Sequence, residues 1–289
     1  ADGGNPHRET LHFIRTFDGN KYFKDEDGSC FRAYRFVDNS KAYDTVDSAE
    51  VFGKSGKAFG RFQKYLSDFP AESLNEIIKN FHNTIWRYEN EFIPAVQADK
   101  ADRAVNCGEE IKFVMHRRED CKKLVELIEK GELPLRVTHN DTKLNNVLFD
   151  SDSDDAICVI DLDTVMPGIA LYDFGDSIRF GANSCSEDDD NYDKVELMLD
   201  YFEAYAKGFL SEAGDALNQC EIDNLAFSAK LMTFECGMRF LTDYLNGDTY
   251  FKTAYPEHNL VRAKNQFALV ADMERKMEQM QQIIKNITE

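Results

Sequence analysis

The spacing of hydrophobic residues changes near residue 48, and this change separates two kinds of predicted structure. Residues 11–37 carry short runs of aromatic and β-branched side chains around two Asp-Gly pairs, which is typical of an antiparallel meander. From about residue 48 the spacing becomes helical. The apolar residues over 59–69 predict one helix that Pro70 stops, and those over 74–81 predict a second.

The remaining sequence predicts helices that flank a few short strands. A charged amphipathic helix over 107–130 ends at Lys130-Gly131. Short apolar runs at 135–137, 146–149 and 157–160 predict strands, and beyond residue 190 the pattern is helical to the end of the sequence. We therefore expect an α+β fold of two lobes. A small β-rich lobe with a hinge would cover residues 1–40, and a large, mainly helical lobe would cover residues 41–289.

The charge balance narrows the possible partners. The chain has 34 Lys and Arg against 53 Asp and Glu, a formal net charge of −19. Proteins bind nucleic acids and anionic membrane surfaces through clustered Lys and Arg side chains, so we expect neither as a partner. No apolar run reaches the roughly 18 residues that a membrane span needs.

The chain has seven cysteines and no C-x-x-C pair. This pattern is typical of reduced thiols in a cytoplasmic protein. We also expect a monomer or a weak dimer.

The densest group of candidate catalytic residues lies between two predicted strands. It has the pattern H-x-D-x-K-x-x-N from His139 to Asn146, and Asp161 follows fifteen residues later at the end of another apolar run. Phosphoryl transfer needs these residue types: a carboxylate that accepts the proton of the attacking hydroxyl, oxygen ligands for Mg²⁺, and a nearby cation. The predicted roles are base for Asp141, metal ligands for Asn146 and Asp161, cation for Lys143, and a structural role in the loop for His139.

A simpler interpretation treats the same residues as turn formers, because Asp and Asn are common in turns. Asp161 would then be an ordinary carboxylate at a strand end. The order strand, loop, strand and Asp, with 20 residues between Asp141 and Asp161, favours the catalytic interpretation.

These motifs resemble the aminoglycoside phosphotransferase and choline kinase superfamily, which shares the protein-kinase fold. More narrowly, the segments at 136–146, 159–168, 173–180, 235–240 and 247–251 resemble the N-acetylhexosamine 1-kinase branch. The resemblance implies transfer of the ATP γ-phosphate, with Mg²⁺, to the anomeric hydroxyl of N-acetylglucosamine or N-acetylgalactosamine. It also implies a sugar pocket lined by Asp141, Lys143, Phe180, Arg239 and Tyr250. From sequence position alone, Arg239 and Tyr250 are a charged and an aromatic residue near helix ends, for which surface roles are the simpler expectation.

Two segments look like other nucleotide-binding motifs. Asp173-Phe174-Gly175 spells the metal-binding motif of protein kinases, but it lies 32 residues after Asp141, and Asp161 already stands at the expected strand end. In this superfamily such an aspartate supports the catalytic loop, so Asp173 is expected to be structural, with Arg179 as a candidate partner. The segment 53–57 lacks the spacing of a phosphate loop and is interpreted as a loop at the start of a helix.

A kinase of this fold also has a small lobe with a glycine-containing hairpin over the phosphates and a strand Lys that pairs with a helical Glu. Nothing before residues 30–37 fits those elements. We therefore expect them upstream of Ala1, in a longer protein. The adenine would meet the hinge backbone near Phe36 and Val37.

Three functions remain open. The first is the hexosamine kinase. The second is the same chemistry on another hydroxyl, in choline, an aminoglycoside or methylthioribose. A choline site favours several aromatic side chains, and a cationic antibiotic favours carboxylates, so Lys143 and Arg239 in the pocket would disfavour both. The third is a kinase-like binding module without catalysis, which would have no need for the complete set of Asp141, Asn146 and Asp161.

Overall fold

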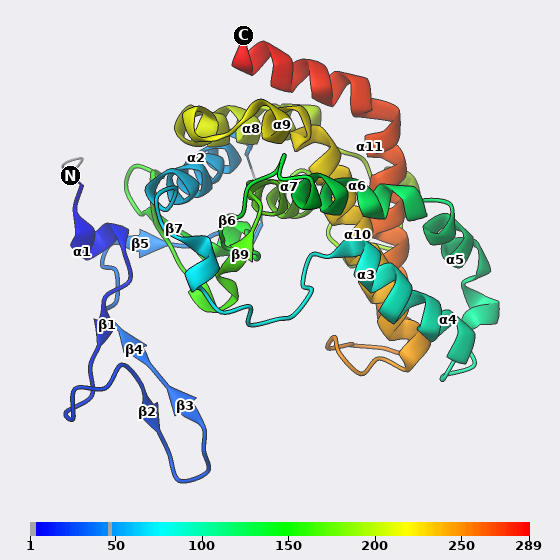
Figure 1. The fold of residues 1–289 in the computed structure, drawn as a ribbon, viewed down its shortest axis with the longest axis horizontal. Coiled ribbons are helices and arrows are strands. Elements are labelled where there is room, and N and C mark those ends of the chain that lie inside the picture. Colours follow the sequence, from blue (N-terminus) through cyan, green and yellow to red (C-terminus); the bar gives the residue numbers. More distant parts are fainter. Residues whose placement is uncertain (1–3, 46–47) are drawn as a thin grey trace.

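The computed structural model describes residues 4–45 and 48–289, and Figure 1 shows their arrangement. A large, mainly helical body carries two small sheets, and a narrow arm made of the first strands extends from it. The α+β class with a small sheet-containing lobe and a large helical lobe is confirmed.

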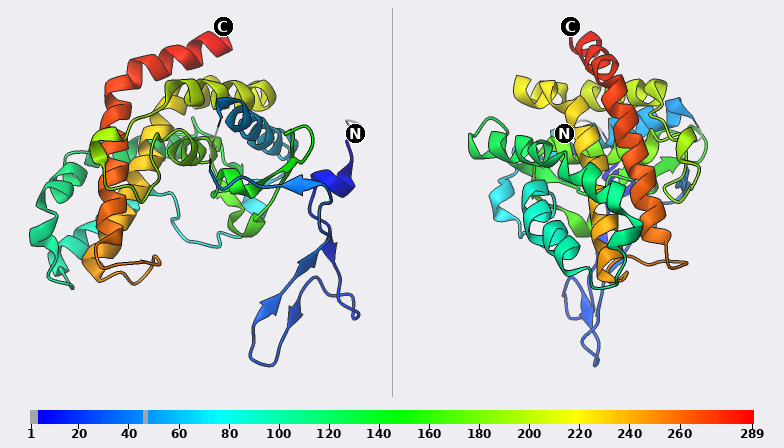
Figure 2. Two further views of the ribbon diagram at one scale, coloured as in Figure 1. Left: turned by 180° about the vertical axis from the view of Figure 1, so that it is seen from behind. Right: turned by 90° about the vertical axis from the view of Figure 1, so that its right-hand side faces the viewer.

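The N-terminal arm is built from paired two-residue strands. After the one-turn helix α1 (Pro6–Glu9), β1 (Phe13–Ile14) pairs with β4 (Ala33–Tyr34), and β2 (Phe23–Lys24) pairs with β3 (Cys30–Phe31). The predicted meander is therefore wrong, since a meander would pair β1 with β2. The first Asp-Gly pair closes a local turn in which the Gly19 N–H donates to the Thr16 carbonyl. Only the second reverses the chain between paired strands. Both views in Figure 2 show this arm projecting from the body.

Two sheets in the body frame the segment that carries the candidate catalytic residues. β5 (Ser40–Lys41), β7 (Val147–Asp150) and β8 (Ala156–Val159) form one antiparallel sheet with β7 in the centre. β6 (Arg136–Thr138) pairs with β9 (Met166–Gly168) in the other. β6, β7 and β8 agree with the predicted runs to within two residues, whereas β5 and β9 were not predicted. The chain therefore leaves one sheet after residue 138 and enters the other at residue 147.

Long helices form the core of the body. They are α2 (Ala49–Tyr65), α7 (Ala170–Gly181), α8 (Leu199–Ala213), α10 (Leu225–Asn246) and α11 (His258–Thr288). Helix α7 is buried along nearly its whole length, because the phenylalanines of α2 and α8 cover it, and α10 packs against both α7 and α11. Shorter α-helices on the periphery are α3 (Thr84–Arg87), α4 (Ile93–Ala98), α5 (Gly108–Met115), α6 (Arg118–Glu129) and α9 (Gln219–Asp223).

Glycines allow α2 and α8 to approach closely. A Cβ on Gly56 would lie 2.5 Å from the carbonyl oxygen of Tyr205, and one on Gly60 would lie 2.3 Å from that of Phe209. The predicted loop at 53–57 is therefore wrong, since this segment lies inside α2, with its glycines facing α8.

Two other helix predictions differ from the structure: one predicted helix is divided in two, and another is absent. The helix predicted over 107–130 is two helices, α5 and α6, and Gly131 with φ 74° follows the second. The helix predicted over 74–81 is absent, and this segment is a loop after a single 3-10 turn at Ala71–Ser73. Its apolar residues Ile78 and Phe81 line cavities instead of a helical interface. Within the described ranges, no helix is both long and apolar enough to cross a bilayer.

Candidate active site

The loop from residue 139 to 146 is held by one buried carboxylate. Asp173 of α7 accepts hydrogen bonds from the backbone N–H groups of His139 (2.9 Å) and Asn140 (2.8 Å) and from Nε2 of Gln63 (2.8 Å). Its complete burial raises its pKa, while the three donors favour the charged form. Asp173 therefore lies beneath the loop in the supporting position that the sequence assigned to it. Its expected partner Arg179 pairs with Asp176 and Glu187 instead.

His139 ties the loop to the strand that precedes Asp161. Its Nε2 lies 2.8 Å from the carbonyl oxygen of Ile160, and its Nδ1 lies 3.3 Å from the backbone nitrogen of Asp141. These contacts fit a neutral ring whose Nε2–H donates and whose Nδ1 accepts. The ring is fully buried against the edges of Phe59 and Phe62. This arrangement gives His139 a structural position away from the cavities.

Asp141 faces a cation on one side and an amide on the other. Its Oδ1 lies 2.8 Å from Nζ of Lys143, and its Oδ2 accepts a hydrogen bond of 3.0 Å from Nδ2 of Asn146. The same amide group donates to the backbone carbonyl of Asp141 at 2.8 Å. The carboxylate is thus fixed in orientation while 28% of the side chain remains exposed, which suits a base that an acceptor hydroxyl must reach.

Neighbouring carboxylates keep Lys143 charged. Burial alone would lower its pKa, but the charges of Asp141 and then Asp176 outweigh burial and raise it. Asp176 also accepts the backbone N–H of Thr142 at 3.0 Å. The ammonium group of Lys143 is therefore a stable positive charge beside the candidate base.

Asp161 stands immediately after β8 and Ile160 in a left-handed backbone conformation, with φ 58°, and is exposed. The backbone N–H of Ile160 donates to the carbonyl oxygen of Asn146 at 2.9 Å, so the segments carrying Asn146 and Asp161 are adjacent. An amide oxygen and a carboxylate are donors of the kind that Mg²⁺ prefers. Among the described residues no group of three or more His, Cys, Asp or Glu is arranged to hold a metal ion, so these two donors would leave the remaining positions to phosphate oxygens and water.

A cavity of about 440 Å³ opens beside Asp141 and Lys143. Its lining includes Arg239 of α10, whose guanidinium lies 5.0 Å from the ring centre of Phe81, 5.5 Å from that of Phe251 and 5.8 Å from that of Tyr250. No carboxylate or hydrogen-bond acceptor among the described residues pairs with it. The cavity is therefore lined by the candidate base and by a guanidinium with free N–H groups.

Four of the five residues predicted for the sugar pocket line this cavity: Asp141, Lys143, Arg239 and Tyr250. Phe180 does not. It lies near the C-terminal end of α7 and packs against the core. Sequence reasoning missed lining residues from the 74–83 loop and from α10, among them Phe81, His82 and Glu235. The spacing of Glu235 and Arg239 by four residues was the available signal, because it places both on one face of a helix.

The two residues predicted for the adenine differ in exposure. Phe36 is 74% exposed, whereas Val37 is 4% exposed, and its carbonyl oxygen accepts a hydrogen bond of 2.6 Å from the Ser40 hydroxyl. A separate cavity of about 550 Å³ lies between the arm and the segment after Asp161, with Arg32 and Asp163 forming an ion pair in its wall. Neither Phe36 nor Val37 lines it.

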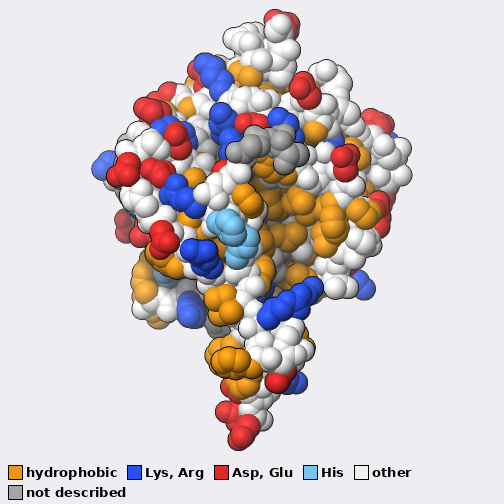
Figure 3. All heavy atoms as spheres, turned by 90° about the vertical axis from the view of Figure 1, so that its left-hand side faces the viewer, with side chains coloured by type: hydrophobic (Ala, Val, Ile, Leu, Met, Phe, Trp, Pro, Cys, Tyr) orange, Lys and Arg blue, Asp and Glu red, His pale blue; other side chains and the backbone are white. Residues whose placement is uncertain are grey.

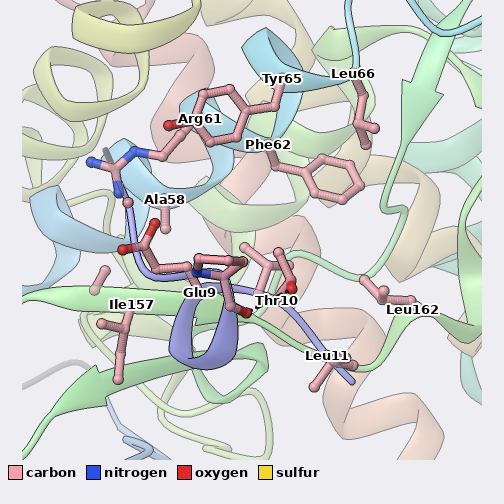
Figure 4. A pocket seen from close by; sticks show the side chains of 14 residues that line it. Glu9, Thr10, Leu11, Ala58, Arg61, Phe62, Tyr65, Leu66, Ile157 and Leu162 are labelled. Carbon is pink, nitrogen blue, oxygen red and sulfur yellow. Dashed lines mark hydrogen bonds between the residues drawn. The ribbon is translucent and has the colours of Figure 1, made fainter. Parts of the chain in front are cut away.

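A third, more apolar cavity of about 580 Å³ lies between α1, α2 and β8. Figure 4 shows Phe62 and Tyr65 of α2 above the segment from Glu9 to Leu11. Figure 3 shows apolar side chains gathered in a hollow on the face from which the arm extends. This cavity has no lining residue in common with the cavity at Asp141, so it is a distinct feature of the body.

Comparison with known proteins identifies the enzyme class. The model of the phosphotransferase enzyme family APH matches residues 14–210, which is more than half of the chain and includes the loop from His139 to Asn146 and Asp161. The chain belongs to this phosphotransferase family. The superfamily inferred from the catalytic motifs is thereby confirmed, and so is an enzymatic rather than a purely binding role.

Solved structures of other phosphotransferases share the fold. A microcompartment-associated aminopropanol kinase is 15% identical with a TM-score of 0.60, and the match covers 96% of this chain and 84% of that one. Choline kinase from Cryptosporidium parvum Iowa II is 15% identical with a TM-score of 0.57 and coverages of 96% and 77%. Spectinomycin phosphotransferase, solved with ADP and spectinomycin, is 14% identical with a TM-score of 0.55 and coverages of 94% and 78%. At these identities the likeness concerns the fold alone.

Proposed function

We propose that this phosphotransferase transfers the γ-phosphate of ATP to the anomeric hydroxyl of an N-acetylhexosamine, either N-acetylglucosamine or N-acetylgalactosamine. The observation that carries the proposal is one cavity lined both by Asp141 and Lys143 and by Arg239 with its aromatic neighbours. A solved relative binds ADP, which supports an adenine nucleotide as the donor.

The unpaired charges of the cavity support an uncharged acceptor that offers oxygen atoms, because the lining carboxylates Asp176, Glu187 and Glu235 already pair with Arg179 or His82. Arg239 has N–H groups without an acceptor among the described side chains, and Lys252 at the same wall has no ion-pair partner there either. Sugar hydroxyls and an amide carbonyl are acceptors for such donors, and the rings of Tyr250 and Phe251 offer apolar surface to a sugar face. A quaternary ammonium or a polycationic antibiotic would meet two unpaired cations at this wall, which disfavours choline and aminoglycosides.

The proposed mechanism assigns one task to each side chain. Asp141 accepts the proton of the anomeric hydroxyl as the hydroxyl oxygen forms a bond to the γ-phosphorus and the bond from that phosphorus to the bridging oxygen breaks, which releases ADP. Asn146 holds the carboxylate of Asp141 in orientation. Lys143 lies 2.8 Å from Asp141, where its charge offsets negative charge on the transferring group. Asn146 and Asp161 would hold Mg²⁺, which, when bound, neutralises charge on the nucleotide phosphates. We place the adenine against the backbone near Phe36 and Val37, at the junction of arm and body.

The test is an assay of ADP release with a panel of acceptors at fixed Mg·ATP. We expect turnover with N-acetylglucosamine or N-acetylgalactosamine and none with their methyl glycosides, in which the anomeric hydroxyl is blocked. Phosphorus NMR of the product should show an anomeric phosphate. Turnover of choline, ethanolamine or an aminoglycoside in place of the sugars would overturn the acceptor assignment and leave the phosphotransferase chemistry intact.

A matched pair of variants tests the assignment of the base. Asp141→Asn removes the proton acceptor and should lower kcat by about 10²–10⁴. Asp215 is exposed on a 3-10 turn and does not line the cavity. Asp215→Asn therefore makes the same chemical change outside the site and should leave kcat unchanged. Equal activity of the two variants would show that Asp141 is not the base.

A further inference from the structure

The loop that carries two aromatic side chains of the acceptor cavity is bound to a single buried carboxylate. This loop follows α10, begins at Gly247 with φ 90°, and brings Tyr250 and Phe251 to the cavity wall beside Arg239. Asp243, in the last turn of α10, is 5% exposed and does not line the cavity.

Three consecutive backbone N–H groups converge on Asp243. Those of Thr249 and Tyr250 donate to its Oδ1 at 2.9 Å each, and that of Phe251 donates to its Oδ2 at 2.9 Å. Nδ2 of Asn259 adds a fourth bond of 2.9 Å to Oδ2. Hydrogen bonds to a charged acceptor are about twice as strong as neutral ones, so the carboxylate fixes the backbone at the positions from which both rings project.

Tyr250 depends on this support because its own side chain is poorly held. The side chain is 67% exposed, and its contacts with described residues are to the rings and guanidinium around it. A second layer braces the carboxylate: Asn259 also donates to Oδ1 of Asp248 at 2.9 Å, and the other oxygen of Asp248 accepts from Arg103 at 2.5 Å. The loop position is thus set by side chains of α10 and α11 and by Arg103, with no contribution from Asp141 or Lys143.

We infer that Asp243 is a positioning residue that sets the affinity for the acceptor by holding Tyr250 and Phe251 against Arg239. The inference rests on the proposed function in one respect, that this cavity binds the acceptor. Asp243→Asn keeps the size of the side chain but turns an amide toward the converging N–H groups. It should raise the acceptor KM about tenfold and leave the nucleotide KM unchanged.

A double-mutant cycle separates positioning from a general loss of structure. If Asp243 acts through the loop, Asp243→Asn combined with Tyr250→Ala should raise the acceptor KM no more than the larger of the two single effects. The inference would be overturned if the double variant raised the acceptor KM by the product of the two single factors. It would also be overturned if Asp243→Asn alone left the acceptor KM within twofold of wild type. Asp215→Asn serves again as the control and should leave both KM values unchanged.

Hydrogen exchange of the wild-type protein provides a readout that needs neither a variant nor an acceptor. The amides of Thr249, Tyr250 and Phe251 should exchange slowly although Tyr250 is exposed. In Asp243→Asn they should exchange at least tenfold faster. Unprotected amides in the wild type would overturn the inference even if Asp243→Asn fails to fold. Protected amides in a protein that phosphorylates no hexosamine would instead leave the support of the loop established and reject the proposed function alone.

Discussion

Replacing Gly60 by alanine tests whether the close contact of α2 with α8 sets the position of the catalytic loop. A Cβ on Gly60 would lie 2.3 Å from the carbonyl oxygen of Phe209 and 3.0 Å from its carbonyl carbon. Both atoms belong to the backbone of α8, so no side chain can rotate away. The helices would have to separate by about 1 Å to restore ordinary van der Waals contact.

Two opposing terms determine the size of the effect. Alanine improves the helix propensity by about 1 kcal/mol. Overpacking costs about 1–3 kcal/mol, and the upper end applies here because the obstacle is backbone. We therefore expect a net loss of about 1–2 kcal/mol in the free energy of unfolding. Since α2 places Phe62 against His139 and Gln63 against Asp173, kcat should fall as well.

Urea unfolding, followed by circular dichroism and by the fluorescence of the single Trp86, measures the loss. The matched control is Gly108→Ala at the start of α5, where an added Cβ would meet nothing within 4 Å. The control should be at least as stable as wild type. If Gly60→Ala is as stable as wild type, or if Gly108→Ala loses as much, the close contact does not limit the packing.

Three further predictions concern charged side chains. Burial would raise the pKa of Asp176, but Arg179 together with Lys143 and His82 outweighs burial and lowers it. These interactions therefore stabilise the fold above about pH 4, and their contribution is lost as pH falls through the folded pKa. Asp176→Asn should therefore flatten the acid side of a Tm–pH profile. Arg136→Met leaves the buried Glu221 unpaired and should cost about 3–5 kcal/mol in urea unfolding, whereas adding Glu221→Gln should recover much of it. Arg239→Lys loses the planar group among the rings and should raise the acceptor KM, not the nucleotide KM, about tenfold.

The candidate catalytic loop could be located from the sequence because its residues are close together along the chain. From His139 to Asn146 the candidate residues stand within one short loop between two strands, and Asp161 follows shortly after the next strand, although distant residues such as Asp173 hold the loop in place. Apolar runs predicted those strands within two residues of their observed bounds. Short-range patterns of this kind are visible in a single sequence because spacing along the chain fixes spacing in space.

The acceptor cavity was less predictable because its walls come from distant parts of the chain. The apolar residues of the 74–83 segment have helical spacing, yet the structure uses Ile78 and Phe81 as cavity lining and forms no helix there. The supporting role of Asp243 depends on three N–H groups that only the turn at Gly247 brings together. The glycines of α2 gave a signal of close packing at 3-4 spacing, but a single sequence does not say which helix approaches them.

The net charge of −19 and the charges in the cavity act over different distances. At physiological ionic strength the Debye length is about 8 Å, so exposed carboxylates elsewhere on the surface are largely screened from a bound acceptor. Within the cavity, Asp141 faces Lys143 at 2.8 Å, and Arg179 faces Asp176 at 3.0 Å, while Arg239 has no carboxylate partner among the described residues. An acidic protein can therefore hold an unpaired positive charge inside one cavity. The net charge therefore affects which polyanions approach the surface, whereas under the proposed function the unpaired guanidinium of Arg239 affects which acceptor binds.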